Sequence, residues 1–349
     1  MSNFYVLDQA VPSEEDRWLR LLKSWQSIEV FANPNYASLF ARSCDRVLCA
    51  VSEQEHGIVV FPFLLRPLRA ELWNKNGPEV YDIINPYGYG GPYFKGDVDA
   101  DEFWDAFDSW ALNSKVVSIF ARLSLFDDQI IPFRGNVAQK SLNVIRRLDM
   151  DLESIWMEYE HKVRKNVKKA LRMGVEIELD WGGRHLDEFM QIYYATMQRR
   201  NASQYYYFND GFFRHIIDKL GEQACFFHAI YEDKVISTEL VLISEENMYS
   251  YLGGTLADFF DLRPNDLLKH NIILWGHENH KKCFILGGGY EENDGIYHYK
   301  KAFAPDCNLP FKTGTKIYDS NVYEELTRLR KEVEPGWVPD ARFFPEYRS

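Results

Sequence analysis

The sequence predicts a mixed α+β protein with two tandem domains. Its 349 residues are more than one ordinary small core needs, and 46% of them are hydrophobic, which is enough to fill two cores. The order of predicted elements also repeats, because both halves run β-α-α-β-β-β-α-β without obvious residue-level identity. Two mixed sheets, each with a face buried under helices, are the simplest fold for this pattern.

The first domain is expected to span residues 1–149. Its helix ADEFWDAFDSWALNSK has apolar residues at helical spacing, which predicts a buried face made of Phe103, Trp104, Phe107, Trp110 and Ala111. The other predicted elements are, in chain order, the strand NFYVLD, a helix from about Ser13 to Trp25, the helix YASLFARSC, the strands RVLCAVSE and HGIVVFPFLLRPL, a strand entering the loop from Asp82 to Phe94, and the strand VVSIFARLSLF.

The second domain is expected to span residues 150–319. A strand near residues 143–148 leads into it, and one long helix runs from Leu152 to about Met173, where Gly174 is a good stop. The strand VEIELDW, the helices HLDEFMQIYYATMQRR and DGFFRHIIDKL, and the strands ACFFHAIYE and VISTELVLIS follow. Residues 320–349 should contain a helix, YEELTRLRKEVE, that packs back on the first domain.

The stretch from Met248 to Phe303 carries the features that predict a site. The strand MYSYLGGT is followed by a helix that opens at Pro264, the strand CFILGGG and the segment HYKKAF. Glycines at 287–289 remove side chains from the end of the second strand, which lets a ligand approach the backbone closely. The first amides of the helix lack intrahelical partners and can face a phosphate. This βαβ crossover predicts a site for an acyl carrier.

Composition limits the partners. A net charge of −12 argues against a protein that coats nucleic acid, and no DNA partner is expected. A local basic patch remains, within HKVRKNVKKALRMG, formed by Lys162, Arg164, Lys165, Lys168, Lys169 and Arg172. The five cysteines are scattered and include no CxxC pair, which is typical of reduced thiols. No stretch predicts a membrane span or a signal peptide, so a cytoplasmic protein is expected.

Metal, hydrolase and kinase chemistry find little support. His270, His277 and His280 lie at helical spacings, but no acidic or cysteine partner completes a metal set at a recognisable spacing. We therefore expect no metal and no bound cofactor. Neither a GxSxG elbow nor a Walker loop occurs in the sequence.

Three passages carry a resemblance to a known family: KVRKNVKKALRMGVEIE, YYATMQRRNASQYYYF, and LRPNDLLKHNIILWG together with FILGGG and HYKKAF. With the repeated element order, they resemble the GNAT superfamily of N-acyltransferases, and in particular the Fem family of aminoacyl-tRNA-dependent peptidyl transferases and GNAT-like proteins associated with surface glycans. The resemblance covers roughly Tyr36 to Asp319. It implies two GNAT-like domains and acyltransferase activity, without the coiled-coil arm of some Fem proteins.

One departure from the GNAT pattern bears on the acyl donor. Most acetyl-CoA-dependent members have a loop of the form Arg-x-x-Gly-x-Gly, whose amides bind the pyrophosphate. Here that place reads FDLRPNDLL, which contains no glycine, and Pro264 and Asn265 leave few free amides. The departure favours aminoacyl-tRNA over acetyl-CoA as the donor.

The resemblance places Lys300 where the Fem family has a lysine beside the scissile ester. Its ammonium would stabilise the oxyanion that forms when an amine attacks the carbonyl. Tyr299 would stand beside it as a wall or a hydrogen-bond donor, and Asn265 and Gly288 are further expected substrate-binding residues. The alternative is that Lys300 is a solvated lysine on a surface turn.

Glu239 is the candidate base. Alternation along VISTELVLIS places it on the face of Val235, Val241 and Ile243. A carboxylate on an apolar face would have a raised pKa and could accept a proton from the attacking amine. The alternative is a glutamate at a strand edge that pairs with a lysine.

Other residues are expected to bind the acceptor. Arg199 matches an arginine that the Fem family uses for the diphosphate of a nucleotide-linked acceptor, a task for which the planar guanidinium is suited. The alternative is an arginine favoured by the helix C-terminus. Tyr206 belongs to an aromatic run that fits either a sugar or acyl pocket or a core wedge. Tyr87 and Tyr89 lie in a loop rich in glycine and proline, either a surface for sugar rings or a rigid turn.

The expected function is N-acyl transfer, with an aminoacyl group from aminoacyl-tRNA moving to an amine of a nucleotide- or lipid-linked precursor of the cell wall or surface polysaccharide. The acceptor is a small-molecule or lipid-linked glycan or peptide. Two alternatives stay open: acetyl-CoA-dependent N-acetylation of an amino sugar, and a non-catalytic protein that binds a glycan precursor.

Overall fold

The computed structural model describes residues 3–25, 27–289, 294–340 and 342–349. The chain forms two compact units: unit 1 comprises Met1–Lys140 and Phe311–Ser349, and unit 2 comprises Ser141–Pro310. The sequence placed the domain boundaries at 149/150 and 319/320. The division between units falls inside two long strands, β7 (Asn136–Arg147) and β13 (Asn308–Ile317).

Unit 1 is built on a sheet with the strand order β1-β2-β3-β4-β6-β13, and β5 pairs with β3. Its pairs are antiparallel except for β4 and β6, which are parallel. The elements are β1 (Asn3–Asp8), α1 (Pro12–Lys23), α2 (Pro34–Ser38), β2 (Arg46–Glu53), β3 (His56–Pro67), β4 (Tyr81–Ile84), β5 (Tyr93–Asp97), α3 (Ala100–Asn113), β6 (Val116–Arg122), β13 and α10 (Ser320–Val333).

Unit 2 has a sheet with the order β8-β9-β10-β11-β12-β7, in which β11 and β12 are the parallel pair. The elements after β7 are α4 (Leu152–Glu158), α5 (His161–Arg172), β8 (Glu176–Asp180), α6 (Leu186–Arg199), α7 (Asp210–Leu220), β9 (Ala224–Tyr231), β10 (Lys234–Ile243), β11 (Asn247–Thr255), α8 (Pro264–Glu278), β12 (Cys283–Gly287) and α9 (Gly295–Lys301). Among the helices of the described ranges, none has the length and apolar character to cross a bilayer.

The two sheets repeat one topology. Four antiparallel strands are followed by a parallel neighbour, and an antiparallel strand closes the sheet: β6 and then β13 in unit 1, β12 and then β7 in unit 2. The predicted order β-α-α-β-β-β-α-β is therefore confirmed in both units, with β5 added in unit 1. The closing strand of each sheet begins in the chain segment of the other unit. Strand β7 begins at Asn136, in unit 1, and β13 begins at Asn308, in unit 2.

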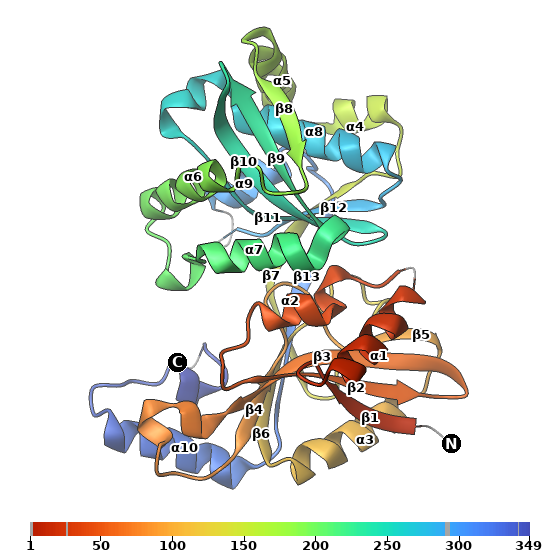
Figure 1. The fold of residues 1–349 in the computed structure, drawn as a ribbon, viewed down its shortest axis with the longest axis vertical. Helices are drawn as coiled ribbons and strands as arrows, with labels where there is room; N and C mark the ends of the chain where they lie inside the picture. The colour runs from red at the N-terminus through yellow and green to blue at the C-terminus, as the bar shows by residue number, and fades with distance from the viewer. Residues whose placement is uncertain (1–2, 26, 290–293, 341) are drawn as a thin grey trace. The chain divides into compact units, whose positions relative to one another are not determined.

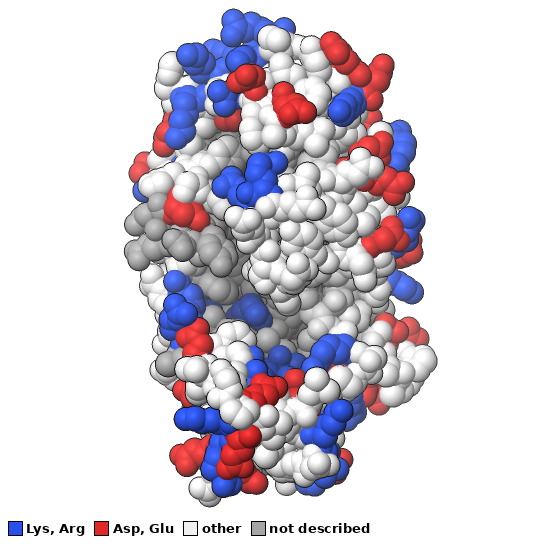
Figure 2. Space-filling view, turned by 90° about the vertical axis from the view of Figure 1, so that its left-hand side faces the viewer, with Lys and Arg blue, Asp and Glu red and all other residues white. Residues whose placement is uncertain are grey.

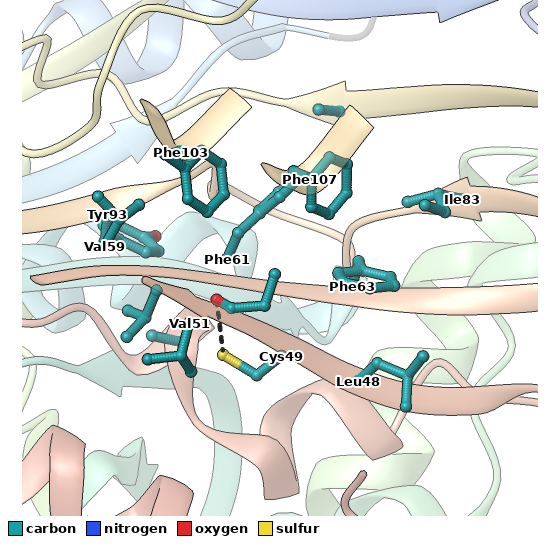
Figure 3. Close-up of a cluster of buried hydrophobic side chains, with 14 of the residues drawn as sticks. Leu48, Cys49, Val51, Val59, Phe61, Phe63, Ile83, Tyr93, Phe103 and Phe107 are labelled. Atoms are coloured by element: carbon teal, nitrogen blue, oxygen red, sulfur yellow. Dashed lines mark hydrogen bonds between the residues drawn. The ribbon is translucent and has the colours of Figure 1, made fainter. Parts of the chain in front are cut away.

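The core of unit 1 lies between α3 and β3. Phe103 and Phe107, one turn apart on α3, point toward Phe61 and Phe63 of β3 (Figure 3), and the Phe61 and Phe107 ring centroids are 5.4 Å apart. Of the predicted helix face, all but Trp110 are fully buried, and Trp110 packs at its edge. Helical spacing thus predicted this contact correctly.

Helices cover both faces of the unit 2 sheet (Figure 1). Successive residues of β9 point to opposite faces, as the strand period of two requires. Phe226 meets Phe189 of α6 at 4.8 Å between ring centroids, and Phe227 meets Trp275 of α8 at 6.0 Å. The strands that lie between α6 and α8 are therefore apolar on both faces of the sheet.

The prediction of one long helix from Leu152 to Met173 was wrong. The backbone is extended at Tyr159 and Glu160, which separates α4 from α5. Arg164 of α5 donates to the carbonyl oxygens of Met157, at 2.7 Å, and of Tyr159. These contacts satisfy carbonyls that the end of α4 leaves without intrahelical partners, which a single-helix pattern cannot show.

The C-terminal segment packs on unit 1, as predicted, and its last residues reach a buried carboxylate. Tyr347 exchanges a hydrogen bond of 2.7 Å with Ser118 of β6, and Arg348 pairs with Asp82 of β4, which Arg66 also contacts at 2.8 Å. Burial opposes ionisation of Asp82, but the two guanidinium groups outweigh it and lower the pKa of this carboxyl.

Replacing Arg348 by Met should therefore destabilise the protein. Removing one partner of a buried ion pair leaves charge uncompensated, and we expect the free energy of unfolding to fall by about 3 kcal/mol. Urea unfolding at pH 7 measures it. Arg342→Met is the control, because the Arg342 side chain is 91% exposed and its ion pair is with nearby Asp340. Equal stability of both variants would contradict the role given to Arg348.

Candidate active site

The pairing of β11 with β12 ends early. Three residue pairs join them, from Asn247 with Cys283 to Tyr249 with Ile285, while β11 continues to Thr255 along β10. The register of β11 shifts at residue 251, where a bulge bends the strand and re-aims its side chains. We call residues 250–251 of β11 together with residues 286–288, at and just beyond the end of β12, the ladder end. Charged side chains of α8 and α9 reach it.

Lys300 reaches the ladder end from α9. Asp294 caps this helix by accepting from the Tyr297 backbone N–H at 2.7 Å. The Lys300 Nζ donates to the carbonyl oxygen of Gly288 at 2.7 Å, which brings the lysine to the triple-glycine segment. Lys300 is partly buried, and burial together with the charge of Lys269 lowers its pKa to about 8.

Glu239 pairs with Lys269 of α8 inside unit 2. The Lys269 Nζ donates to both Glu239 carboxylate oxygens, at 2.5 and 2.6 Å, and to Ser250 Oγ at 3.0 Å. Glu239 and Lys269 are buried, and β10 lies between β9 and β11 rather than at a sheet edge. Because both carboxylate oxygens serve Lys269, the geometry favours an ion pair, and the proposed base role of Glu239 stays a prediction.

The N-terminus of α8 lacks one backbone amide and has a buried carboxylate in its first turn. Arg263 precedes the helix in the left-handed conformation, with φ of 60°, and Pro264 has no N–H to offer. Asp266 is buried in the first turn, where Asn166 donates to it at 3.2 Å, and burial raises its pKa. The Tyr299 hydroxyl donates to the Asn265 carbonyl oxygen at 3.3 Å, so α9 and the start of α8 are joined.

Arg199 and Tyr206 lie elsewhere in unit 2. Arg199 ends α6, donates to the Thr255 carbonyl oxygen at 3.2 Å and lies over the Phe260 ring at 5.0 Å. The Tyr206 carbonyl oxygen accepts from the Tyr193 hydroxyl. Arg199 is exposed, whereas Tyr206 is partly buried, and a ligand role for either residue stays a prediction.

Tyr87 and Tyr89 belong to unit 1. The Tyr89 ring packs against Phe31 and Phe311 at centroid distances of 5.5 and 5.6 Å, and burial raises its pKa. The Tyr87 carbonyl oxygen accepts from the Tyr36 hydroxyl at 2.7 Å. A ligand role for these tyrosines stays a prediction.

Sequence reasoning missed Lys269, Asp266 and Ser250. A signal was present for the first two, because Asp266 and Lys269 share a helix face with the buried Ile272 and Ile273 at spacings of three and four residues. Charged residues on an apolar face are rarely buried without a partner. Nothing comparable marks Ser250, whose contact depends on how α8 packs over β11.

The comparisons with known proteins concern the family of one domain and the fold of the chain. A family model described as an acetyltransferase (GNAT) domain matches residues 158–301, which include β11, α8, β12 and α9. The solved structure of FemX matches with a TM-score of 0.66 and 14% identity, over 89% of this chain and 98% of that chain. No curated protein sequence matches the chain.

Two further solved structures share the fold. A conserved protein of unknown function from Bacteroides thetaiotaomicron matches with a TM-score of 0.55 and 10% identity, over 90% of this chain and 100% of that chain. The C-terminal domain of a putative lysylphosphatidylglycerol synthetase from Agrobacterium fabrum matches with 0.52 and 11%, over 89% and 93%. The family model thus identifies an acyltransferase domain of the GNAT class within residues 158–301. Its two-unit fold is Fem-like.

Replacing Lys300 by Met should lower turnover by about two to three powers of ten, because the ammonium at the ladder end is lost. Wild-type activity should fall as pH rises through about 8, where the ammonium loses its proton, and the variant should lack this limb. The pKa of Lys300 in the folded protein lies below the ordinary lysine value, so its charge costs stability below pH 8 and the variant should melt no lower there. A pH series of initial rates and melting curves tests both.

Lys301→Met is the matched control, since this neighbour on α9 makes no contact at the ladder end among those recorded for the described chain. Full activity of Lys300→Met would remove Lys300 from the mechanism.

Proposed function

We propose that the protein transfers an aminoacyl group from aminoacyl-tRNA to an amine of a nucleotide- or lipid-linked precursor of the cell wall or surface polysaccharide. The Fem-like fold supports the class of reaction. The observation that carries the choice of donor is the buried carboxylate of Asp266 in the first turn of α8, a turn that is joined to α9 by the hydrogen bond from Tyr299 to Asn265.

The residues at the ladder end fit the chemistry of aminolysis. The acceptor nitrogen attacks the carbonyl carbon of the ester, a C–N bond forms, and the carbonyl oxygen becomes an oxyanion. The Lys300 ammonium donates a hydrogen bond to the neutral carbonyl oxygen of Gly288. It can stabilise the negative charge of the oxyanion. The ester C–O bond then breaks, the amide remains on the acceptor, and the proton from the amine ends on the ribose oxygen of the departing tRNA. The proton passes through solvent in this scheme.

Asp266 disfavours a coenzyme A donor. A diphosphate at a helix N-terminus is bound by free amides and by the positive end of the helix dipole. At α8 the first amide is absent at Pro264, and the Asp266 carboxylate would repel a diphosphate when it is ionised. An aminoacyl ester places no diphosphate next to its carbonyl, so the same feature does not weaken its binding.

The basic helix α5 supports a tRNA donor. Lysines and arginine recur along one of its faces at spacings of three and four residues, namely Lys162, Lys165, Lys169 and Arg172. Lys and Arg side chains gather at the end of unit 2 where Figure 1 places α5 (Figure 2). Although the net charge of the chain is −12, a patch of this kind supplies the scattered cations that an acceptor arm needs.

For the acceptor, Arg199 remains the proposed diphosphate ligand and Tyr87, Tyr89 and Tyr206 the proposed ring-binding residues. Arg199 is exposed at the end of α6, and desolvation lowers its pKa without removing its charge at neutral pH. The acceptor's amine, not a metal or a cofactor, supplies the nucleophile in this proposal.

The donor can be decided by offering the protein charged tRNA or acetyl-CoA with a pool of amino sugars and peptidyl precursors. We expect transfer from charged tRNA, with binding that weakens steeply as salt rises. Tight, salt-insensitive binding of acetyl-CoA without affinity for tRNA would overturn the proposal and support N-acetylation. Binding of a glycan precursor without turnover of either donor would support the non-catalytic alternative.

Neutralising the basic face tests the tRNA contact itself. The triple variant Lys165→Gln, Lys169→Gln, Arg172→Gln should reduce the slope of log affinity against log salt by about one for each tRNA phosphate that it no longer neutralises. The control carries Lys75→Gln, Lys219→Gln and Lys331→Gln, which removes equal charge from exposed sites outside α5. Arg164 is left intact because it caps α4. Equal slopes for the two triple variants would place the tRNA elsewhere.

A further inference from the structure

The hydrogen bond from Lys269 fixes the Ser250 hydroxyl oxygen as an acceptor. An ammonium can only donate hydrogen bonds, so the bond of 3.0 Å from Lys269 Nζ must be accepted by the Ser250 oxygen. The hydroxyl proton therefore cannot point at Lys269. Among the bonds recorded for the described residues, the Ser250 hydroxyl donates to no protein acceptor, and the residue is partly exposed.

The direction of the Lys269 ammonium is also fixed. Its other two protons are bonded to the two carboxylate oxygens of Glu239, and both side chains are buried. All three donors of the ammonium are thus committed, which holds the third toward Ser250. A buried, fully bonded pair of this kind rotates less freely than an exposed lysine.

Ser250 occupies a defined place in the sheet. It is the first residue of β11 beyond the pairs that join β11 to β12, and the bulge follows at residue 251. Lys300 approaches from the other strand of the pair, through its bond to Gly288.

We infer that Ser250 is a catalytic residue whose hydroxyl proton donates to the carbonyl oxygen of the acyl group, and that Glu239 and Lys269 are the positioning residues that turn this proton toward it. The inference rests on the proposed acyl transfer but holds for an ester or a thioester, because both present the same carbonyl oxygen. As the C–N bond forms and this oxygen gains negative charge, the hydrogen bond strengthens. It weakens again when the bond to the leaving group breaks.

Turnover separates this role from a structural one. Ser250→Ala should lower kcat by about a hundredfold, as loss of one oxyanion donor does, with KM for the acceptor unchanged. Ser250→Thr, which keeps the hydroxyl, should retain most activity. Ser237→Ala is the control, since it removes a buried hydroxyl on β10 that bonds Thr255 rather than the ladder end.

A second set of variants tests the positioning residues. The double variant Glu239→Gln, Lys269→Met avoids an unpaired buried charge, and its melting curve shows whether it folds. We expect its kcat to fall about as far as that of Ser250→Ala, and adding Ser250→Ala to it should cost little more, because the three residues act as a unit. Losses that multiply, or a Ser250→Ala variant with wild-type kcat, would overturn the inference.

Binding provides a readout that does not depend on turnover. The probes are a 3′-aminoacylamido-3′-deoxyadenosine, which mimics the end of charged tRNA, and S-acetonyl-coenzyme A, which mimics acetyl-CoA. Ser250→Ala should weaken the probe that wild type binds by about three- to tenfold, the effect of one hydrogen bond. If only the coenzyme A probe binds, the proposed donor fails while Ser250 is still tested on that probe. If wild type binds and turns over neither, both proposals are overturned.

Discussion

The buried pair between Glu239 of β10 and Lys269 of α8 is the interaction on which the candidate site depends. Two charges removed from water are costly, and only good geometry and full hydrogen bonding offset that cost. Here three bonds use every proton of the ammonium. The pair therefore fixes α8 against the middle of the sheet, and with it the position of Ser250, of the α8 N-terminus and of Tyr299, which bonds to that N-terminus.

The charges around this pair explain why Lys300 differs from Lys269. Lys269 has a carboxylate as its partner, whereas Lys300 is bonded to a neutral carbonyl oxygen. Burial and the neighbouring ammonium lower the pKa of Lys300, and Glu239 and Asp294 raise it. An ammonium without a direct carboxylate partner is the better group to meet a transient oxyanion, since no ion pair has to be broken first.

The two units use the same topology differently. In unit 1 the strands β4 and β6 stay joined beyond their paired residues, because the Asn85 side chain bridges to the Arg122 backbone, donating to its carbonyl at 2.6 Å and accepting from its N–H at 2.8 Å. In unit 1, the buried carboxylate of Asp82 forms an ion pair with Arg348 near the C-terminus. In unit 2 the corresponding end of the β11–β12 pair is met by two lysines instead. The same topology therefore has a strand pair bridged by Asn85 in unit 1. In unit 2 it has a strand pair whose end is contacted by Lys269 and Lys300.

The sequence by itself determined the element order, the buried face of α3 and the crossover from β11 through α8 to β12, because these depend on local periodicity and on residues close in the chain. Only the tertiary structure decided the break between α4 and α5, the burial of Asp266 and the partner of Glu239. Residues 239 and 269 are far apart in sequence, and both alternatives for Glu239, base or paired glutamate, fit the same strand pattern. Which one holds depends on how α8 packs across the sheet, and that packing comes from long-range apolar contacts that no local pattern records.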